Sequence, residues 1–550
     1  MKHCRFVLLL ALATSLQADV KLASPFTDHM VLQRELPVPV WGWADPGEKI
    51  TVGFAGQKQT ATTGNDGKWM LRLTPLTASA ASRDFVVTGK NTLTLQDVIV
   101  GEVWLGSGQS NMDFSVSKKA KYFAGVDNEE KEIAAANYPQ IRMFTGKSAK
   151  AYAPQQTVGG EWLVCSPETV PGFSAVGYFF ARELQKELKV PVGIVTLSFG
   201  ASCAQAWIRR DVMLDDPGFK SVLDRFDEQV KSYTPPAAEV IKQWEETAAK
   251  AKAAGQRAPR RPGADPVQDQ HNPTVMFNGM IAPVIPFAIR GVLWYQGESI
   301  TAPRELFPRW NELLITDWRK LWGRELPFYF VQLAALDNAS NSPQVREWQA
   351  EALKLPNTGM AVTIDIGDRK DVHPHNKAPL GDRLARIALA NVYGRKIEFS
   401  GPQYDSMFVE KGALRLKFSH TGGGLVAKDG PLKAFEVAGR NGIFVPAQAT
   451  IEADRVVLRS PEIPAPVAAR YAWSNFPDGA NFYNAAGLPA APFRTARAVA
   501  GRGQCWRCSR CGSRHKPAHK SGWQRRQTSW THTAASASHR SRPPLRAPWP

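Results

Sequence analysis

A serine at the end of a glycine-rich turn has the sequence context of a catalytic nucleophile. Residues 98–105 form an apolar run typical of a strand, and a turn containing Gly106 and Gly108 leads from it to Ser110. Glycine allows the backbone to bend sharply at positions where a side chain would clash. A serine on such a strand-to-helix turn projects its hydroxyl beyond the sheet, beside backbone N–H groups that can bind an anion. Most serines in such turns have no catalytic role, so this hypothesis depends on partners elsewhere in the chain.

Three later loops supply the partners that such a nucleophile needs. Each loop follows a strand-like run, at the position where open α/β sheets bind their ligands. Gly200 can offer a backbone N–H to an oxyanion, and the side-chain amide of Gln296 can do the same. His373, in the last loop, is the candidate base. Each residue alone would more often be structural, but together they predict acyl transfer by a serine nucleophile.

The acid partner of the histidine is open between two aspartates. Asp371 precedes His373 by two residues and Asp368 precedes it by five, and a loop can bring either carboxylate to the imidazole. We expect Asp371 to be the partner, with Asp368 as the alternative. None of the four loops contains a cluster of metal ligands, so we expect neither a metal nor another cofactor.

The elements that would position these loops form an α/β sheet between two β regions. Over residues 99–395, near-continuous apolar runs alternate with helical patterns, as in a doubly wound, mostly parallel sheet. Residues 210–265 interrupt this pattern with a charged, helical segment that we interpret as an insertion. Short alternating runs separated by turns predict an N-terminal β-sandwich over residues 19–98 and a C-terminal β domain over residues 396–498.

The two ends of the chain differ from this folded body. Residues 1–18 combine basic residues with a short apolar run, which predicts a secretory signal peptide and a secreted or periplasmic protein. We expect no membrane span, because no stretch is long and apolar enough to cross a bilayer as a helix. Residues 499–550 are basic and lack apolar periodicity, which predicts a disordered tail. Its cysteines at 505, 508 and 511 resemble a zinc motif, but the segment offers no core to support one.

The charge and the cysteines of the folded body look different once this tail is set aside. The last 50 residues contain eleven of the 68 basic residues and no acidic one, so the rest carries 57 basic against 50 acidic residues. The net charge of +18 therefore does not indicate a nucleic-acid partner. Only Cys165 and Cys203 lie in the predicted folded body, and the sequence leaves open whether they pair or remain free thiols.

Three motifs in the predicted loops carry a family resemblance. They are Gly-Gln-Ser-Asn-Met at 108–112, Trp-Tyr-Gln-Gly-Glu-Ser at 294–299 and Asp-x-His-Pro-x-Asn-Lys at 371–377. They resemble the motifs of the sialate O-acetylesterase family in the SGNH-hydrolase superfamily, and the likeness extends from about residue 20 to residue 497. It implies an SGNH-hydrolase-like fold and an esterase that removes O-acetyl groups from sialic acids. By this resemblance Ser110 is the nucleophile, His373 the base, and Gly200 and Gln296 the oxyanion donors.

The same resemblance suggests which residues meet the O-acetylated sugar. Asn111 and Glu298 lie inside the shared motifs and are candidate substrate-binding residues. A sialate carries a carboxylate, which the planar fork of an arginine matches, and Arg346 and Arg209 are the candidates for that contact. The family usually has an asparagine where this chain has Ile300, which changes one polar contact near the third loop.

Two other functions fit parts of the sequence. Deacetylation of xylan or another glycan is the alternative within the esterases, because related hydrolases share the Gly-Gln-Ser-Asn turn. A catalytically inert carbohydrate-binding protein is the alternative from a different class. The presence of Ser110, Gln296 and His373 together argues against the inert protein.

Overall fold

The computed structural model describes residues 19–495, except residues 257, 260, 302 and 340–341. The expected signal peptide and the expected basic tail lie outside the described residues. Within the described ranges, no helix is both long enough and apolar enough to cross a membrane.

The central element is a large, mostly parallel sheet. Its strand order is β10-β9-β11-β8-β12-β13-β14, and every neighbouring pair is parallel except β10 with β9. The strands are β8 (Thr92–Gly108), β9 (Tyr138–Gly146), β10 (Gly160–Cys165), β11 (Val192–Ser198), β12 (Gly291–Tyr295), β13 (Phe328–Val331) and β14 (Thr358–Ala361). The apolar runs that predicted buried strands coincide with β11, β12, β13 and β14, because a parallel sheet covered on both faces needs apolar side chains on both.

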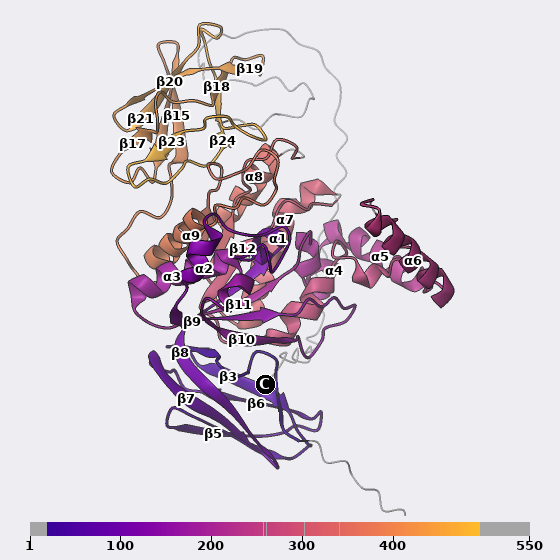
Figure 1. The fold of residues 1–550 in the computed structure, drawn as a ribbon. Helices are drawn as coiled ribbons and strands as arrows, with labels where there is room; N and C mark the ends of the chain where they lie inside the picture. The colour runs from indigo at the N-terminus through magenta and orange to yellow at the C-terminus, as the bar shows by residue number, and fades with distance from the viewer. Residues whose placement is uncertain (1–18, 257, 260, 302, 340–341, 496–550) are drawn as a thin grey trace, which may run out of the picture. The chain divides into compact units, whose positions relative to one another are not determined.

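Helices cover both faces of this sheet (Figure 1). Alternate residues of β8 show this directly, because side chains along a strand point to opposite faces. Trp104 packs in one apolar cluster with residues of α3 (Ala175–Leu188) and α9 (Ala378–Asn391). Its neighbours Val103 and Leu105 belong to a second cluster that contains residues of α7 (Phe307–Trp322). The mixed α/β prediction is confirmed, with helices wound over both sides of the central sheet.

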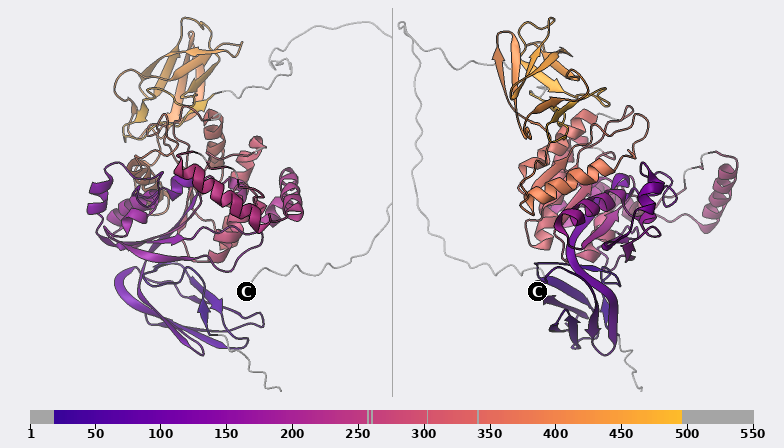
Figure 2. Two further views of the ribbon diagram at one scale, coloured as in Figure 1. Left: turned by 45° about the vertical axis from the view of Figure 1, so that its right-hand side comes forward. Right: turned by 60° about the vertical axis from the view of Figure 1, so that its left-hand side comes forward.

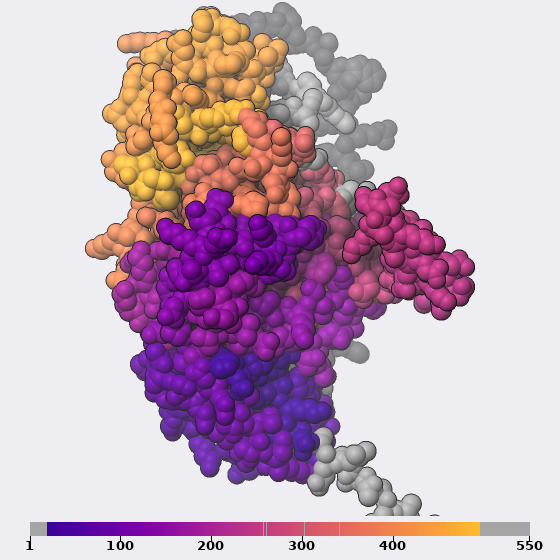
Figure 3. Space-filling view, in the orientation of Figure 1, coloured from indigo at the N-terminus to yellow at the C-terminus, as the bar shows by residue number. Residues whose placement is uncertain are grey.

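The remaining helices of the sheet region are shorter or lie in the insertion. The short ones are α1 (Ser110–Asp113), α2 (Glu129–Ala134), α4 (Arg210–Leu214) and α8 (Ser342–Ala350). Residues 210–265 contain α5 (Pro217–Ser232) and α6 (Ala238–Ala253). No residue of α6 is buried, whereas α5 buries four apolar side chains. Figure 3 shows side chains of this helical segment in magenta on the molecular surface.

The N-terminal strands are joined to the central sheet through β8. Its first half pairs antiparallel with β7 and its middle pairs parallel with β2 before the strand enters the central sheet. The N-terminal strands are β1 (Lys21–Leu22), β2 (Val31–Gln33), β3 (Val38–Trp43), β4 (Lys49–Phe54), β5 (Gln57–Thr62), β6 (Lys68–Leu73) and β7 (Ser79–Thr88). The boundary expected at residues 98/99 therefore falls inside one continuous strand.

Antiparallel strands return after α9. Two four-stranded sheets have the orders β15-β16-β21-β20 and β19-β18-β22-β24, and β17 pairs with β23. These are the orange and yellow strands of Figure 2. Their bounds are β15 (Gln403–Glu410), β16 (Ala413–Ser419), β17 (Leu425–Ala427), β18 (Phe435–Ala438), β19 (Phe444–Pro446), β20 (Gln448–Glu452), β21 (Arg455–Arg459), β22 (Ala468–Tyr471), β23 (Phe482–Asn484) and β24 (Phe493–Arg494). The Tyr483 hydroxyl donates to Asp365 at 3.0 Å, which ties β23 to the loop after β14.

Candidate active site

The ends of three neighbouring strands lie at the same level in the central sheet. Gly108, the last residue of β8, is paired with Ser198 on β11 and with Tyr295 on β12. Gly108 has φ of +131°, and a side-chain carbon there would lie 2.1 Å from the carbonyl oxygen of Tyr295, so only glycine fits. The register therefore places the turns that carry Ser110, Gly200 and Gln296 side by side.

The structure brings Ser110 and His373 into hydrogen-bond distance. Oγ of Ser110, the first residue of α1, lies 2.9 Å from Nε2 of His373. The imidazole is 16% exposed and packs against the tilted ring of Phe123, with the ring centres 4.8 Å apart. Burial lowers the pKa of His373 below its usual 6.5, although the Asp371 carboxylate acts in the opposite direction. A neutral imidazole with Nε2 facing the hydroxyl can accept the serine proton.

Asp371, rather than Asp368, faces the imidazole. Its Oδ1 lies 3.4 Å from Nδ1 of His373 and also accepts the backbone N–H of His373 at 2.8 Å. Asp368 instead accepts the backbone N–H groups of Lys370 and Asp371, at 2.7 and 2.9 Å, and so shapes the turn that precedes the histidine. Because Nδ1 faces a carboxylate, the tautomer with its proton on Nδ1 is favoured, which leaves Nε2 free to act as a base.

Gly200 lies next to the serine. A side-chain carbon on Gly200 would be 3.8 Å from Cβ of Ser110. The backbone N–H of Gly200 has no acceptor among the residues that the structure describes. Ser110 begins α1, where backbone N–H groups have no partner within the helix. Among the described residues, neither the Gly200 N–H nor the Ser110 N–H therefore has a backbone acceptor beside the serine.

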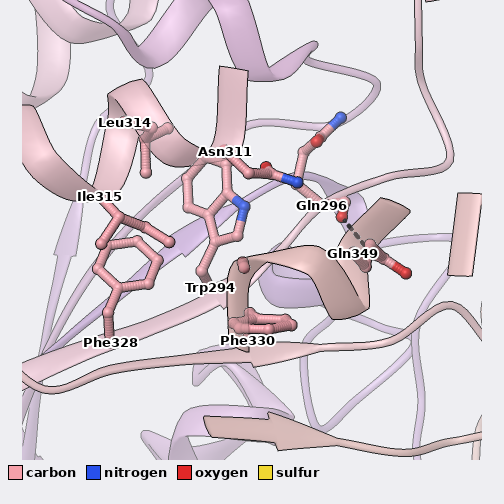
Figure 4. A pocket seen from close by; sticks show the side chains of 9 residues that line it. Trp294, Gln296, Asn311, Leu314, Ile315, Phe328, Phe330 and Gln349 are labelled. Carbon is pink, nitrogen blue, oxygen red and sulfur yellow. Dashed lines mark hydrogen bonds between the residues drawn. The ribbon is translucent and has the colours of Figure 1, made fainter. Parts of the chain in front are cut away.

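Gln296 is close to this turn, but its side-chain donors are already used. Its Nε2 donates to the carbonyl oxygens of Ser202 and Ser299, at 3.3 and 2.8 Å. The backbone carbonyl oxygen of Gln296 accepts a hydrogen bond from Nε2 of Gln349 at 3.0 Å, drawn as the dashed line in Figure 4. The small cavity in that view is lined mainly by core side chains such as Trp294. In this conformation Gln296 holds its loop together and offers no amide proton to an oxyanion.

Buried Asn111, the residue after the serine, pairs with half-buried Glu298. Nδ2 of Asn111 donates to Oε1 of Glu298 at 2.5 Å and to the carbonyl oxygen of Val372 at 2.9 Å. Oδ1 of Asn111 accepts from Nζ of Lys377 at 2.6 Å. Since Asn111 is 1% exposed and both ends of its amide are bonded, it contacts three protein loops rather than a substrate in this structure.

Neither predicted arginine is available to a substrate carboxylate. Arg346 is fully buried, and its guanidinium donates to the carbonyl oxygens of Leu333, Ala334, Ser474 and Asn475 at 2.8–2.9 Å. Burial lowers its pKa to about 10.

Arg209 is also committed to protein partners. It makes a two-pronged ion pair with Asp317, with a shortest distance of 2.6 Å, and a further ion pair with Asp211 at 2.9 Å. Both predicted arginines thus have protein partners in this structure, and the sequence does not show those partners.

A hollow lies beside Asp371 and Val372. Asp371 and Glu298 line it together with Arg304 and Ile300. Backbone and side chains of the loop after β13, including Leu333–Leu336 and Asn338, complete the lining. A sugar bound here would lie beside the proposed acid of the triad.

Two residues of the site were not singled out by sequence reasoning. His375 lies 3.5 Å from Asp371 through Nε2, and its Nδ1 is bonded to the carbonyl oxygen of Gly125. Lys377 is buried against Asn111. The shared Asp-x-His-Pro-x-Asn-Lys motif contained the lysine, but a lysine at a helix start more often lies in solvent.

Neither Cys165 nor Cys203 takes part in the hydrogen bonds of this site. Cys165 and Cys203 are buried free thiols, which settles the question that the sequence left open. Burial raises the pKa of each thiol to about 12, so both are poor nucleophiles near neutral pH. In the described part of the chain, no three His, Cys, Asp or Glu side chains are grouped as metal ligands.

The matching family model, the related sequences and the related crystal structure all describe acetylesterases. Residues 270–390 match the carbohydrate esterase family described as sialic acid-specific acetylesterase. The chain is 28% identical to a sialate O-acetylesterase from Mus musculus, over 88% of this chain and 96% of that protein. The enzyme of the same name from Homo sapiens is 28% identical over 86% and 92%. A crystal structure of a carbohydrate acetylesterase from Xanthomonas citri is 34% identical, with a TM-score of 0.73, and covers 87% of this chain and 100% of that one.

Proposed function

The chain belongs to the sialate O-acetylesterase family, and from this premise we propose that it hydrolyses O-acetyl esters of sialic acid through a serine acyl-enzyme. The observation that carries the proposal is the 2.9 Å distance between Oγ of Ser110 and Nε2 of His373 at the carboxyl edge of the central sheet. A hydroxyl and a mostly buried imidazole at this distance form the nucleophile–base pair that acyl transfer requires.

Acylation uses the neutral histidine. Nε2 of His373 removes the proton of the Ser110 hydroxyl as Oγ attacks the acetyl carbonyl carbon. The carbonyl oxygen becomes an oxyanion, and the backbone N–H groups of Gly200 and Ser110 are its proposed donors. The tetrahedral intermediate then collapses, the ester C–O bond breaks, and the imidazolium gives its proton to the departing sugar oxygen. Asp371 orients the imidazole and supports its positive charge.

Deacylation repeats these steps with water. His373 removes a proton from a water molecule that attacks the acetyl group on Ser110. Collapse of the second tetrahedral intermediate breaks the bond to Oγ, releases acetate and returns the proton to the serine. Apart from water, these reaction steps use only side chains and backbone groups of the described site.

The sugar is proposed to lie in the hollow beside Asp371. We assign recognition of the sialate carboxylate to Arg304, because this arginine lines the hollow. A guanidinium matches a carboxylate with two parallel hydrogen bonds. Export, as residues 1–18 predict, would place the enzyme where acetylated glycans are accessible.

The test measures acetate release from three esters at matched ester concentration. They are O-acetylated sialic acid, acetylated xylan and a simple aryl acetate. Turnover of the aryl acetate distinguishes an esterase from an inert glycan-binding protein. Faster release from xylan than from the sialate would contradict the proposed substrate.

A matched pair of variants tests the carboxylate contact. Arg304→Ala should lower kcat/KM for the sialate ester more than for the aryl acetate, which has no carboxylate. Arg369→Ala removes an arginine that pairs with Asp337 and Asp478 and does not line the hollow, so it is the control. Equal losses on both esters for Arg304→Ala would show that the arginine does not read the carboxylate.

A further inference from the structure

A chain of hydrogen-bonded polar groups, two of them buried and one half-buried, links the three loops of the site. Nζ of Lys377 donates to Oδ1 of Asn111 at 2.6 Å, and Nδ2 of Asn111 donates to Oε1 of Glu298 at 2.5 Å. The same Nδ2 donates to the carbonyl oxygen of Val372 at 2.9 Å. One amide therefore contacts the loop after β12, the loop before His373 and the start of α9.

The two ends of these linked groups carry opposite charge, and the lysine end is buried. Lys377 is 1% exposed, and its Nζ lies 4.6 Å from the centre of the Phe114 ring and 5.4 Å from that of Tyr295. Aromatic faces attract a cation, which favours an ammonium at this position. Burial raises the pKa of Glu298, and the hydrogen bond from Asn111 and the charge of Lys377 oppose that rise.

These hydrogen-bonded groups lie next to the residues that are proposed to react. Asn111 follows Ser110 directly in α1, and Val372 precedes His373 directly. The hydrogen bond from Asn111 to the carbonyl of Val372 therefore joins the residue beside the nucleophile to the residue beside the base. Because Lys377 and Glu298 bond the two ends of the Asn111 amide, that amide cannot rotate without breaking both contacts.

We propose that Lys377 is a positioning residue for acyl transfer: its ammonium, bridged by Asn111 to the carboxylate of Glu298, holds the serine turn and the histidine loop at their reactive separation. The inference rests on the proposed esterase function.

Lys377 also acts on the base through its charge. The groups that influence the pKa of His373 are the Asp371 carboxylate, which raises it, and Lys377 and His375, which lower it along with burial. Those that act on Lys377 are Glu298 and Asp371, which raise its pKa against the burial that lowers it to about 7. When it is protonated, Lys377 thus favours the neutral, proton-accepting form of His373.

The test replaces the ammonium by a side chain of similar length. Lys377→Met should lower kcat for an aryl acetate on the order of 100-fold with little change in KM, because a displacement of about 1 Å costs that much. The acid limb of kcat/KM should move to higher pH, since removal of the ammonium lets the pKa of His373 rise. Lys370→Met is the matched control: this lysine is exposed in the same loop and should leave both readouts unchanged.

Two more variants keep the inference testable if Lys377→Met does not fold. Glu298→Gln should also lower kcat and move the limb to higher pH, because a buried ammonium without a counter-charge loses its proton. Asp371→Asn should move the limb the other way, since its carboxylate raises the pKa of His373.

The outcomes separate the inference from the function on which it rests. The positioning role would be overturned if the acid limb of kcat/KM were unchanged in Lys377→Met, even if the melting temperature fell. If Lys377→Met does not fold, an unchanged acid limb in Glu298→Gln would overturn it instead. Absence of turnover in the unmodified protein would instead overturn the proposed esterase function.

Discussion

The contribution of Asp371 to turnover can be bounded from its geometry. The change is Asp371→Asn, which keeps the shape of the side chain and an oxygen that can accept the backbone N–H of His373. What it removes is the negative charge 3.4 Å from Nδ1. That charge stabilises the imidazolium that forms in the transition state, so its loss should appear in kcat.

The size of the loss follows from the exposure of the carboxylate. Opposite charges about 4 Å apart attract by roughly 1 kcal/mol in bulk water and by roughly 4 kcal/mol near a protein surface. The side chain of Asp371 is 44% exposed, so both limits bear on it. Since about 1.4 kcal/mol changes a rate tenfold, kcat should fall between about 5-fold and 1000-fold. The same change in a serine-protease triad costs about 10,000-fold, because the asparagine there favours the wrong tautomer of the histidine.

Asp368→Asn is the comparison that makes this measurement decisive. Asp368 accepts two backbone N–H groups, and an asparagine oxygen can accept the same bonds. Its kcat should fall less than about 5-fold, below the lower limit estimated for Asp371. The assay is the steady-state turnover of an aryl acetate at neutral pH, with the melting temperature of each variant as a fold control. Full activity of Asp371→Asn together with a large loss in Asp368→Asn would refute the assignment of the acid.

Three further outcomes are expected. Ser110→Ala should remain folded and lose more than about 1000-fold in kcat, measured by acetate release; near-normal turnover would remove Ser110 from the mechanism. Because burial lowers the pKa of His373 below 6.5 and the base must be neutral, kcat/KM should rise with pH through a midpoint below 6.5; a midpoint above that value would show that Asp371 outweighs burial. Arg346→Met should lower the free energy of unfolding, measured by denaturant titration, by about 3 kcal/mol or more, because buried carbonyls lose their donor. An unchanged free energy of unfolding would mean that these carbonyls find other partners.

The positions of the reactive loops could be predicted from the sequence because strand periodicity is a local signal. Apolar runs identified β11 and β12, and parallel strands bring their carboxyl ends to one edge. Ser110, Gly200 and His373 each follow such a run by a few residues or lie in the loop beyond it, and the structure brings them together.

The partners of polar side chains could not be predicted in the same way. The sequence shows that Gln296 and Arg346 carry donors near the site, but not that carbonyl groups already accept from those donors. These carbonyls belong to segments distant in the chain, such as residues 474–475. Lys377 was overlooked for the converse reason, since its burial depends on the rings of Phe114 and Tyr295 from two other loops.

The continuity of β8 limits how this enzyme can be recombined with its relatives. One strand of 17 residues begins against β7, ends at Gly108 and leads directly to the proposed nucleophile. At its centre, the Glu102 carboxylate pairs with Arg34 at 2.5 Å and with Arg290 at 2.7 Å, and so connects the two sheet regions that share the strand. A chimaera joined at residues 98/99 would combine two halves of β8 that come from different proteins and evolved beside different neighbouring strands. An error in the register of the combined strand would shift Ser110 relative to Gly200. Crossover points for exchanging modules are therefore better placed beyond the serine turn, or before residue 92, than at the apparent sequence boundary.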